Sequence, residues 1–232
     1  MSTKSTPMKK LFILFIATVI STPLLAQCDK IFDFKEGTYW TWSNYNKKGK
    51  LLGKTIQKVD KLTIDGADRL ATMTVATSDD KGEQTAPVTM EMACRSGVIY
   101  VDMKKFIPEE QLKDADLELA IDASNLEMPK DMKVGDRLKD ASITMNLSGD
   151  SPMAMNMSVN ITDRKVLAEE TINTSAGEFD CLVLQQTIST KMMMSFSMES
   201  KEWYSIGTGM VKSETYRKGK LTGYSLLTTF SR

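Results

Sequence analysis

Methionine is the residue whose number and spacing first point to chemistry in this sequence. The chain has 17 methionines in 232 residues, and several stand at alternate positions, as in the runs "TMEMA", "MAMNM" and "MMMSFSM". Alternate residues of a β-strand share one face of a sheet. The pattern therefore predicts an apolar sheet face made of Met90, Met92, Met145, Met153, Met155, Met157, Met192, Met194, Phe196 and Met198.

Three interpretations of this apolar face compete. The first, which we favour for the face as a whole, is ordinary core packing. The second is a groove for lipid or another apolar ligand, since methionine is flexible and polarisable. The third is a soft-metal site, because thioethers bind Cu(I). Three alternate residues of one strand spread over about 13 Å, which is too far for all of them to reach one ion. We therefore expect no metal site.

The residues that most catalytic sites need are missing from this chain. It contains no histidine, which removes Ser-His-Asp and Cys-His catalysis and nearly all protein zinc sites. Glycine-rich phosphate-binding motifs are also absent. The 30 acids lie mainly in turns and on polar strand faces, where solvated surface is the ordinary role of a carboxylate. We expect no enzyme, no catalytic residues and no cofactor.

The N-terminus has the pattern of a secretory signal peptide. Lys9 and Lys10 precede an apolar run from Leu11 to Ile20, and the small residue Ala26 follows. The apolar run is shorter than the roughly 20 residues of a spanning helix. Cleavage after Ala26 would leave residues 27–232, predicted as a single β-rich domain that is exported, periplasmic or secreted, and not membrane-spanning. Removal of residues 1–26 takes away three lysines and changes the net charge from 0 to −3, so nucleic acid is not an expected partner.

The three cysteines, Cys28, Cys94 and Cys181, allow one disulfide in an oxidising compartment, with one thiol left over. The sequence "LLAQC" also looks like a lipoprotein cleavage box with Cys28 as the lipidated residue. The residue before Cys28 is Gln27, whereas such boxes carry a small residue there. Lipid anchoring through Cys28 is therefore the less favoured alternative.

Strands joined by short turns account for most of the sequence. The phrases "YNKKGKLL" at 45–52 and "YRKGKLTG" at 216–223 each contain a Lys-Gly-Lys turn between alternating residues, and "SDDKGEQ" at 78–84 is a similar turn. Trp40 and Trp42 alternate in the same way, and we expect them, with Trp203 and Tyr204, to close the end of a β core rather than to stack on a ligand. One stretch, "IPEEQLKDAD", has the features of a helix.

The predicted fold class is therefore all-β with one minor helix. Successive strands with short turns and no alternating helices form antiparallel sheets. We expect a large curved antiparallel sheet, a half-barrel meander, with a short helix or cover segment at 104–116. The stretch "SNLEMPKDMKVGD" at 124–136 is expected to continue this cover or to form an edge.

Four phrases together resemble an exported bacterial family, the TapB-like domain of unknown function. They are "FKEGT" at 34–38, "GEF" at 177–179, an aromatic pair before "GTGMVK" at 203–212, and the final Lys-Gly-Lys hairpin. The resemblance runs from about residue 28 to the C-terminus. It implies a curved half-barrel outside the cytoplasm, broadly similar to lipoprotein-carrier folds, and brings no catalytic residues. It also implies a disulfide between Cys28 and Cys94, which would leave Cys181 as a buried thiol.

The function expected from the sequence is a non-enzymatic exported protein that holds an apolar ligand or a partner segment on its Met-rich face. The alternative is an envelope structural or assembly protein in which that face is wholly internal and no ligand binds.

Overall fold

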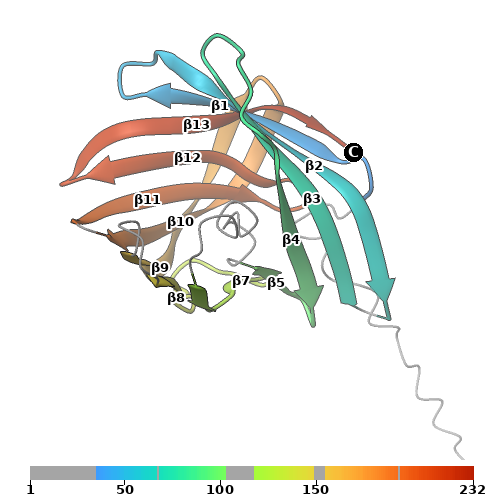
Figure 1. Ribbon diagram of the computed structural model, residues 1–232. Coiled ribbons are helices and arrows are strands. Elements are labelled where there is room, and N and C mark those ends of the chain that lie inside the picture. Colours follow the sequence, from blue (N-terminus) through green and yellow to red (C-terminus); the bar gives the residue numbers. More distant parts are fainter. Residues whose placement is uncertain (1–34, 67, 103–117, 149–154, 193) are drawn as a thin grey trace, which may run out of the picture.

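The computed structural model describes residues 35–66, 68–102, 118–148, 155–192 and 194–232 of the chain. Within these ranges the chain forms thirteen strands and no helix (Figure 1). The strands are β1 Tyr39–Asn46, β2 Leu51–Asp65, β3 Asp68–Asp79, β4 Val88–Arg95, β5 Val98–Val101, β6 Glu118–Ala123, β7 Leu126–Pro129, β8 Ala141–Ser148, β9 Met155–Thr174, β10 Gly177–Lys191, β11 Ser195–Ser205, β12 Gly209–Arg217 and β13 Lys220–Ser231.

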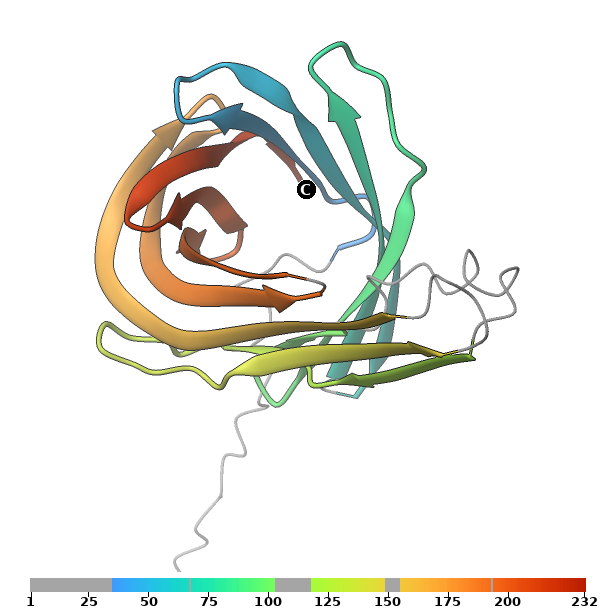
Figure 2. The same cartoon turned by 60° about the vertical axis from the view of Figure 1, so that its left-hand side comes forward.

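All thirteen strands belong to one antiparallel sheet with the order β6-β8-β9-β10-β11-β12-β13-β1-β2-β3-β4-β5-β7. The sheet curls strongly, as Figure 2 shows, and its two edge strands, β6 and β7, form no ladder with each other. The predicted all-β class and the large curved antiparallel sheet are confirmed. The predicted edge at 124–136 is also found, because it contains β7. The predicted helix or cover segment at 104–116 lies outside the described residues.

The first and last strands of the chain are neighbours in the sheet. Strand β1 pairs with β13 over its whole length, with Tyr39 opposite Ser231 and Asn46 opposite Gly223. This pairing places the two Lys-Gly-Lys turns side by side, and the backbone N–H of Lys47 donates to the carbonyl of Thr222 (3.1 Å). The repeated phrase is therefore two adjacent hairpins of one sheet.

The two similar phrases form different turns, because one carries an extra lysine. In the β1–β2 turn, Asn46 Oδ1 accepts hydrogen bonds from the N–H groups of Lys48 and Lys50, and Gly49 has φ +79°. The β12–β13 turn has only two central residues, Lys218 and Gly219, both with positive φ (50° and 71°), which is the signature of a type I′ turn. The β3–β4 turn repeats the first type, with Asp79 Oδ1 in the role of Asn46 Oδ1.

The long hairpin β9–β10 bends around strands β11–β13 (Figure 2). In its turn, Ser175 Oγ donates to the carbonyl of Thr228 in β13 (3.1 Å). Buried residues gather beneath this bend, among them Val183, Trp203 and Leu227. The curl thus gives the sheet a core in which its two ends cover each other.

A buried arginine ties the edge strand β7 to the other half of the sheet. Arg164 in β9 is 1% exposed, and its Nη1 donates to the carbonyls of Glu127 in β7 (2.9 Å) and Lys139 (2.7 Å). The N–H of Leu138 in turn donates to the carbonyl of Arg164 (2.9 Å). Because the two edges of the sheet do not pair directly, these hydrogen bonds, together with the ion pair between Lys139 and Glu127 (3.0 Å), connect β7 to the other half of the sheet.

The strand predicted from "MMMSFSME" is wrong in its extent. Lys191 pairs with Ser195, so the chain reverses between them, and the N–H of Met192 donates to the carbonyl of Met194 (3.2 Å). Met192 and Met194 therefore lie in the β10–β11 turn and are exposed, as is Phe196 at the start of β11. The alternation of apolar and polar residues continues through the turn, so no sequence signal marks the reversal.

Cys94 is disulfide-bonded, whereas Cys181 is a free buried cysteine. Cys28 and the predicted signal peptide lie outside the described residues, so the Cys28–Cys94 pair stays a prediction. In the described part of the chain there is no helix of the length and hydropathy needed to cross a bilayer.

Candidate binding cavity

A cavity of about 310 Å³ lies where β1, β2, β4, β5 and β7 face β11, β12 and β13. Its walls are mainly apolar, and strands distant in the sequence contribute to them because the sheet curls. The lining residues are Trp42, Asn44, Thr55, Gln57, Met90, Met92, Val101, Leu126, Met128, Tyr204, Met210 and Ser225.

Four methionines from three strands meet in this cavity. Met90 and Met92, both members of the predicted apolar face, lie two positions apart on β4. Their side chains are therefore on the same side of the strand, and both line the cavity. Met128 comes from the edge strand β7 and Met210 from β12. The indole of Trp42 completes the wall, and its Nε1 donates to the carbonyl of Met210 (2.9 Å). Such side chains give an apolar surface that adapts its shape, because thioether side chains are flexible.

A small polar group lies in the same wall. Ser225 Oγ donates to Asn44 Oδ1 (2.7 Å), and Asn44 Nδ2 donates to Thr55 Oγ1 (3.0 Å). These bonds leave the hydroxyl hydrogen of Thr55 and the lone pairs of Ser225 with capacity for a further partner. The cavity thus combines apolar walls with one polar cluster, formed by Asn44, Thr55 and Ser225.

Tyr204 borders the cavity and belongs to a buried polar network. Its hydroxyl donates to Glu202 Oε2 (2.5 Å), while Glu202 Oε1 accepts from Gln186 Nε2 (2.8 Å) and Ser200 Oγ (3.0 Å). Burial, followed by the nearby Glu202 carboxylate, raises the pKa of Tyr204 well above its ordinary value. Tyr204 therefore stays a neutral hydrogen-bond donor at physiological pH.

Arg164 joins this network through Gln186. Its Nε donates to Gln186 Oε1 (3.2 Å), so the amide of Gln186 stands between the guanidinium and the Glu202 carboxylate. Burial lowers the pKa of Arg164, and the nearby Glu202 carboxylate acts in the opposite direction. An arginine keeps its proton despite such a shift. The network holds β9, β10 and β11 in register behind the cavity wall.

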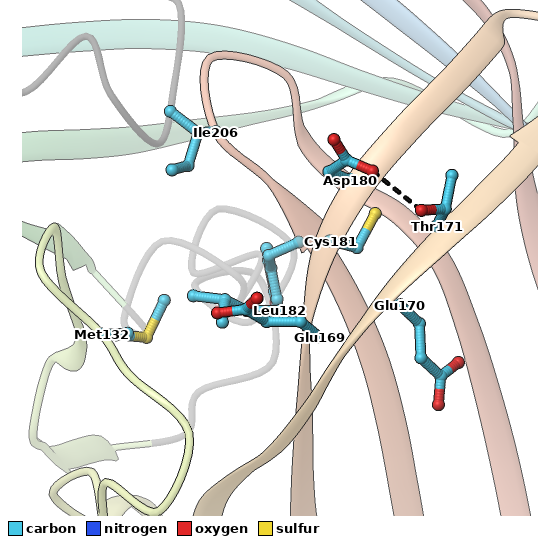
Figure 3. Close-up of a pocket in the computed structure, with 9 residues that line it drawn as sticks. Met132, Glu169, Glu170, Thr171, Asp180, Cys181, Leu182 and Ile206 are labelled. Atoms are coloured by element: carbon cyan, nitrogen blue, oxygen red, sulfur yellow. Dashed lines mark hydrogen bonds between the residues drawn. The ribbon is translucent and has the colours of Figure 1, made fainter.

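A second cavity, of about 430 Å³, which Tyr204 also lines, is shown in Figure 3. Met132, Cys181, Leu182 and Ile206 line it together with several polar side chains. Two of its three acids have structural partners, since Thr171 Oγ1 donates to Asp180 Oδ1 (2.8 Å) and Trp203 Nε1 donates to Glu170 Oε2 (2.8 Å).

The thiol in this second cavity is poorly suited to nucleophilic chemistry. Burial, with Asp180 and Glu170 nearby, raises the pKa of Cys181 to about 12, and its Sγ donates to the carbonyl of Phe179 (3.5 Å). A thiol is a nucleophile only as a thiolate. Although larger, this cavity thus offers a less promising site than the methionine-lined one.

The structure divides the residues predicted as one apolar face into three groups. Met90 and Met92 line the cavity. Met145 and Met157 are half-buried and lie opposite each other in the β8–β9 ladder, where Met155 also pairs with Leu147. Met192, Met194, Phe196 and Met198 lie at or beside the β10–β11 turn. Met153 lies outside the described residues.

Sequence reasoning missed Met128, Met210 and the polar lining residues of the cavity. Met128 lies in the four-residue strand β7, which is too short for residue alternation to identify it as a strand. Of the four aromatic residues expected to close a β core, Trp40 and Trp203 are buried, whereas Trp42 and Tyr204 also line the cavity. Among the described residues, no group of three or more His, Cys, Asp or Glu side chains has the geometry of a metal site.

The fold is similar to two known crystal structures. One is a protein from Bacteroides fragilis described as exported, with a YmcC-like fold, at a TM-score of 0.70 and 23% identity, covering 88% of this chain and 100% of that one. The other is a protein from Parabacteroides distasonis described as a lipoprotein, at a TM-score of 0.69 and 22% identity, covering 88% of this chain and 99% of that one. At such identities the likeness establishes the fold.

No curated protein sequence matches the chain. A family model does match, over residues 35–227, and it describes a domain of unknown function, as the sequence resemblance implied, although the name TapB-like is not confirmed. The match covers nearly the whole described sheet, from the segment before β1 to β13. The chain belongs to the DUF3108-like family.

Proposed function

We propose that this protein is an exported, non-enzymatic binding protein that holds an apolar ligand with one polar group in its methionine-lined cavity. The observation that carries the proposal is the convergence of Met90, Met92, Met128, Met210 and Trp42 on one space of about 310 Å³. Ligand sites in proteins are concave and mostly apolar, with a few placed polar groups, and begin at about 300 Å³.

The polar cluster in the cavity wall favours a ligand with one polar end. Thr55 and Ser225 retain hydrogen-bonding capacity, whereas the methionines offer only weak acceptors. Fatty acids and similar single-chain amphiphiles have this combination of an apolar body and a compact polar group. A ligand of this class would place its chain against the thioethers and its polar group at Asn44, Thr55 and Ser225.

Three observations support a location outside the cytoplasm. The sequence begins with a signal-peptide pattern that ends near Ala26. Cys94 is disulfide-bonded, which is typical of proteins in oxidising compartments. The two similar crystal structures are of proteins described as exported and as a lipoprotein.

A binding role fits the chemistry better than catalysis does. The chain has no histidine, and the Cys181 thiol is held protonated by a pKa of about 12. Glu202, the carboxylate behind the cavity wall, accepts hydrogen bonds from three side chains. These groups support the fold rather than a reaction.

Titration with an apolar fluorescent probe, N-phenyl-1-naphthylamine, tests the proposal. Val101 lines the cavity, so Val101→Trp fills space that the probe needs and should weaken its binding by about tenfold or more, the effect of losing one well-buried apolar contact region. Val134→Trp is the matched control, because Val134 is exposed and lies outside the cavity lining. Circular dichroism and the melting temperature show whether each variant folds.

The rival function is an envelope structural or assembly protein. Met90 and Met92 are each 4% exposed, a burial that would also suit a purely internal core. Native mass spectrometry of the protein purified from its own export compartment separates the two. A bound apolar molecule supports the binding role, whereas no co-purified molecule and no probe binding would leave the structural role as the better account.

A further inference from the structure

Four hairpin turns lie at the same end of the sheet, which we call the hairpin end: β1–β2, β3–β4, β10–β11 and β12–β13. The strand register requires this arrangement, because Lys191 pairs with Ser195, Glu199 with Tyr216, Arg217 with Lys220, Asn46 with Gly223, and Gly53 with Asp79. In Figure 1, β1 and β12 end and β13 begins along the left-hand edge of the sheet.

The β1–β2 and β12–β13 turns form one basic surface. They carry six exposed cations and no acid: Lys47, Lys48, Lys50, Arg217, Lys218 and Lys220. The β13–β1 pairing brings the two turns side by side, with Lys47 hydrogen-bonded to the backbone of Thr222. The neighbouring β3–β4 turn holds acids, and its Asp80 pairs with Lys50 (3.2 Å). The other five cations of the two turns form a concentrated positive surface. This surface contrasts with the net charge of −3 expected for residues 27–232.

The β10–β11 turn adds an exposed apolar tip beside this basic surface. Met194 is 83% exposed, Met192 43% and Phe196 41%. Between Gln186 and Met198 the sole charged residue is Lys191, which is itself exposed. Exposure of large apolar side chains to water is unfavourable, and their burial lowers the free energy of the system.

We propose that the hairpin end docks on the surface of an anionic lipid bilayer, with Met192, Met194 and Phe196 inserted among the acyl chains and the lysines and arginine at the headgroups. A combination of apolar and basic residues on one face is typical of proteins that lie on membranes, where both burial and charge contribute to binding. A protein partner would need a shaped apolar surface, whereas this tip projects from the end of a sheet and has charge complementarity to anionic headgroups. The docking does not depend on a ligand in the cavity.

Vesicle co-sedimentation of the mature protein tests the docking. Wild-type protein should bind vesicles of phosphatidylcholine with 30% phosphatidylglycerol in 50 mM salt, bind pure phosphatidylcholine at least tenfold more weakly, and dissociate in 1 M salt, where charges are screened within about 3 Å. Met192→Ser with Met194→Ser should weaken binding by about tenfold, because two apolar side chains are lost from the contact. Lys48→Glu with Lys220→Glu should weaken it by about 25-fold or more, since each cation contributes about fivefold.

Matched changes away from the hairpin end serve as controls. Ile206→Ser alters an apolar side chain that is 65% exposed in the β11–β12 turn at the opposite end, and Lys61→Glu with Lys133→Glu makes the same charge change elsewhere on the surface. Both should bind vesicles as wild type does. The proposal is overturned if wild type binds neither vesicle, if it binds both equally, if the controls weaken binding as much, or if the tip variants alter only self-association in size-exclusion chromatography.

Discussion

Tyr45, which opens the first copy of the repeated phrase, and Tyr224, which directly follows the second, stack on each other across the β1–β13 pair, with ring centroids 5.0 Å apart and an angle of 19° between the rings. The stack joins the first strand of the chain to the last and holds the two Lys-Gly-Lys hairpins beside each other. The same pairing places Asn44 opposite Ser225, so the polar group of the cavity depends on it.

The two hairpins should respond in opposite ways to the same substitution. Lys218 has φ +50° in a type I′ turn, so Lys218→Gly removes backbone strain and should stabilise the protein by about 0.5 to 1 kcal/mol. Lys48 has no such strain, and Lys48→Gly should destabilise it by about 0.5 to 1 kcal/mol through the added backbone freedom of the unfolded chain. Urea denaturation measures both. Equal effects at the two positions would contradict the difference in turn type.

Gly53 should be far less tolerant of a side chain than Gly82. A Cβ at Gly53 would lie 1.9 Å from the carbonyl oxygen of Ser78 in the paired strand β3, whereas one at Gly82 would meet nothing within 4 Å. Gly53→Ala should therefore cost about 2 to 4 kcal/mol, and Gly82→Ala only about 1 kcal/mol of backbone strain at φ +89°. The free energy of unfolding of the two variants checks this, and a Gly53→Ala protein as stable as wild type would show that β2 and β3 do not approach as described.

Arg164 should be the most sensitive charged residue of the sheet. Arg164→Leu removes the donor for Gln186 and for the carbonyls of Glu127 and Lys139, leaving buried acceptors without partners. We expect a loss of about 3 to 5 kcal/mol, as for other buried charges whose network is broken. Arg137→Leu, at an exposed arginine, should change stability by less than about 0.5 kcal/mol. If Arg164→Leu were as mild as its control, the tie between β7 and β9 would not contribute to stability.

Cys181 should resist thiol reagents in the folded protein. Burial raises its pKa from 9.0 to about 12, which lowers the thiolate population at pH 8 by about a thousandfold. Iodoacetamide should therefore label Cys181 in urea and leave it unmodified in buffer. Because the folded pKa lies above the unfolded one, the contribution of the neutral thiol to stability is complete below about pH 9 and is lost as pH rises towards 12. Labelling of the native protein at the rate of an exposed cysteine would refute this environment.

Local features of the fold were predictable from the sequence, and long-range ones were not. Alternation around Trp40, Trp42, Met90 and Met92 identified strands and their buried faces, and glycine and lysine marked the turns. Strand alternation gives no information about which strands become neighbours, so the β1–β13 pairing could not be deduced.

The candidate site was predictable only in part for the same reason. Met90 and Met92 were predicted on an apolar face, but Met128 and Met210 reach the cavity only because the sheet curls. Arg164 carries no sequence signal of burial, since its partners are a side chain of β10 and carbonyls far along the chain. In the β10–β11 turn, methionines continued the alternation of a strand where the backbone reverses.

The most direct test of ligand binding in the cavity is a titration of protein labelled with ¹³C at the methionine ε-methyl groups, followed by NMR with decanoate as the apolar ligand. Our account predicts saturable shifts of Met90, Met92, Met128 and Met210, which line the cavity. Met73, which is buried outside the cavity lining, and the exposed Met194 should not shift. Shifts confined to Met192 and Met194, or no saturable shift of the four cavity methyl groups, would contradict a binding cavity at this site.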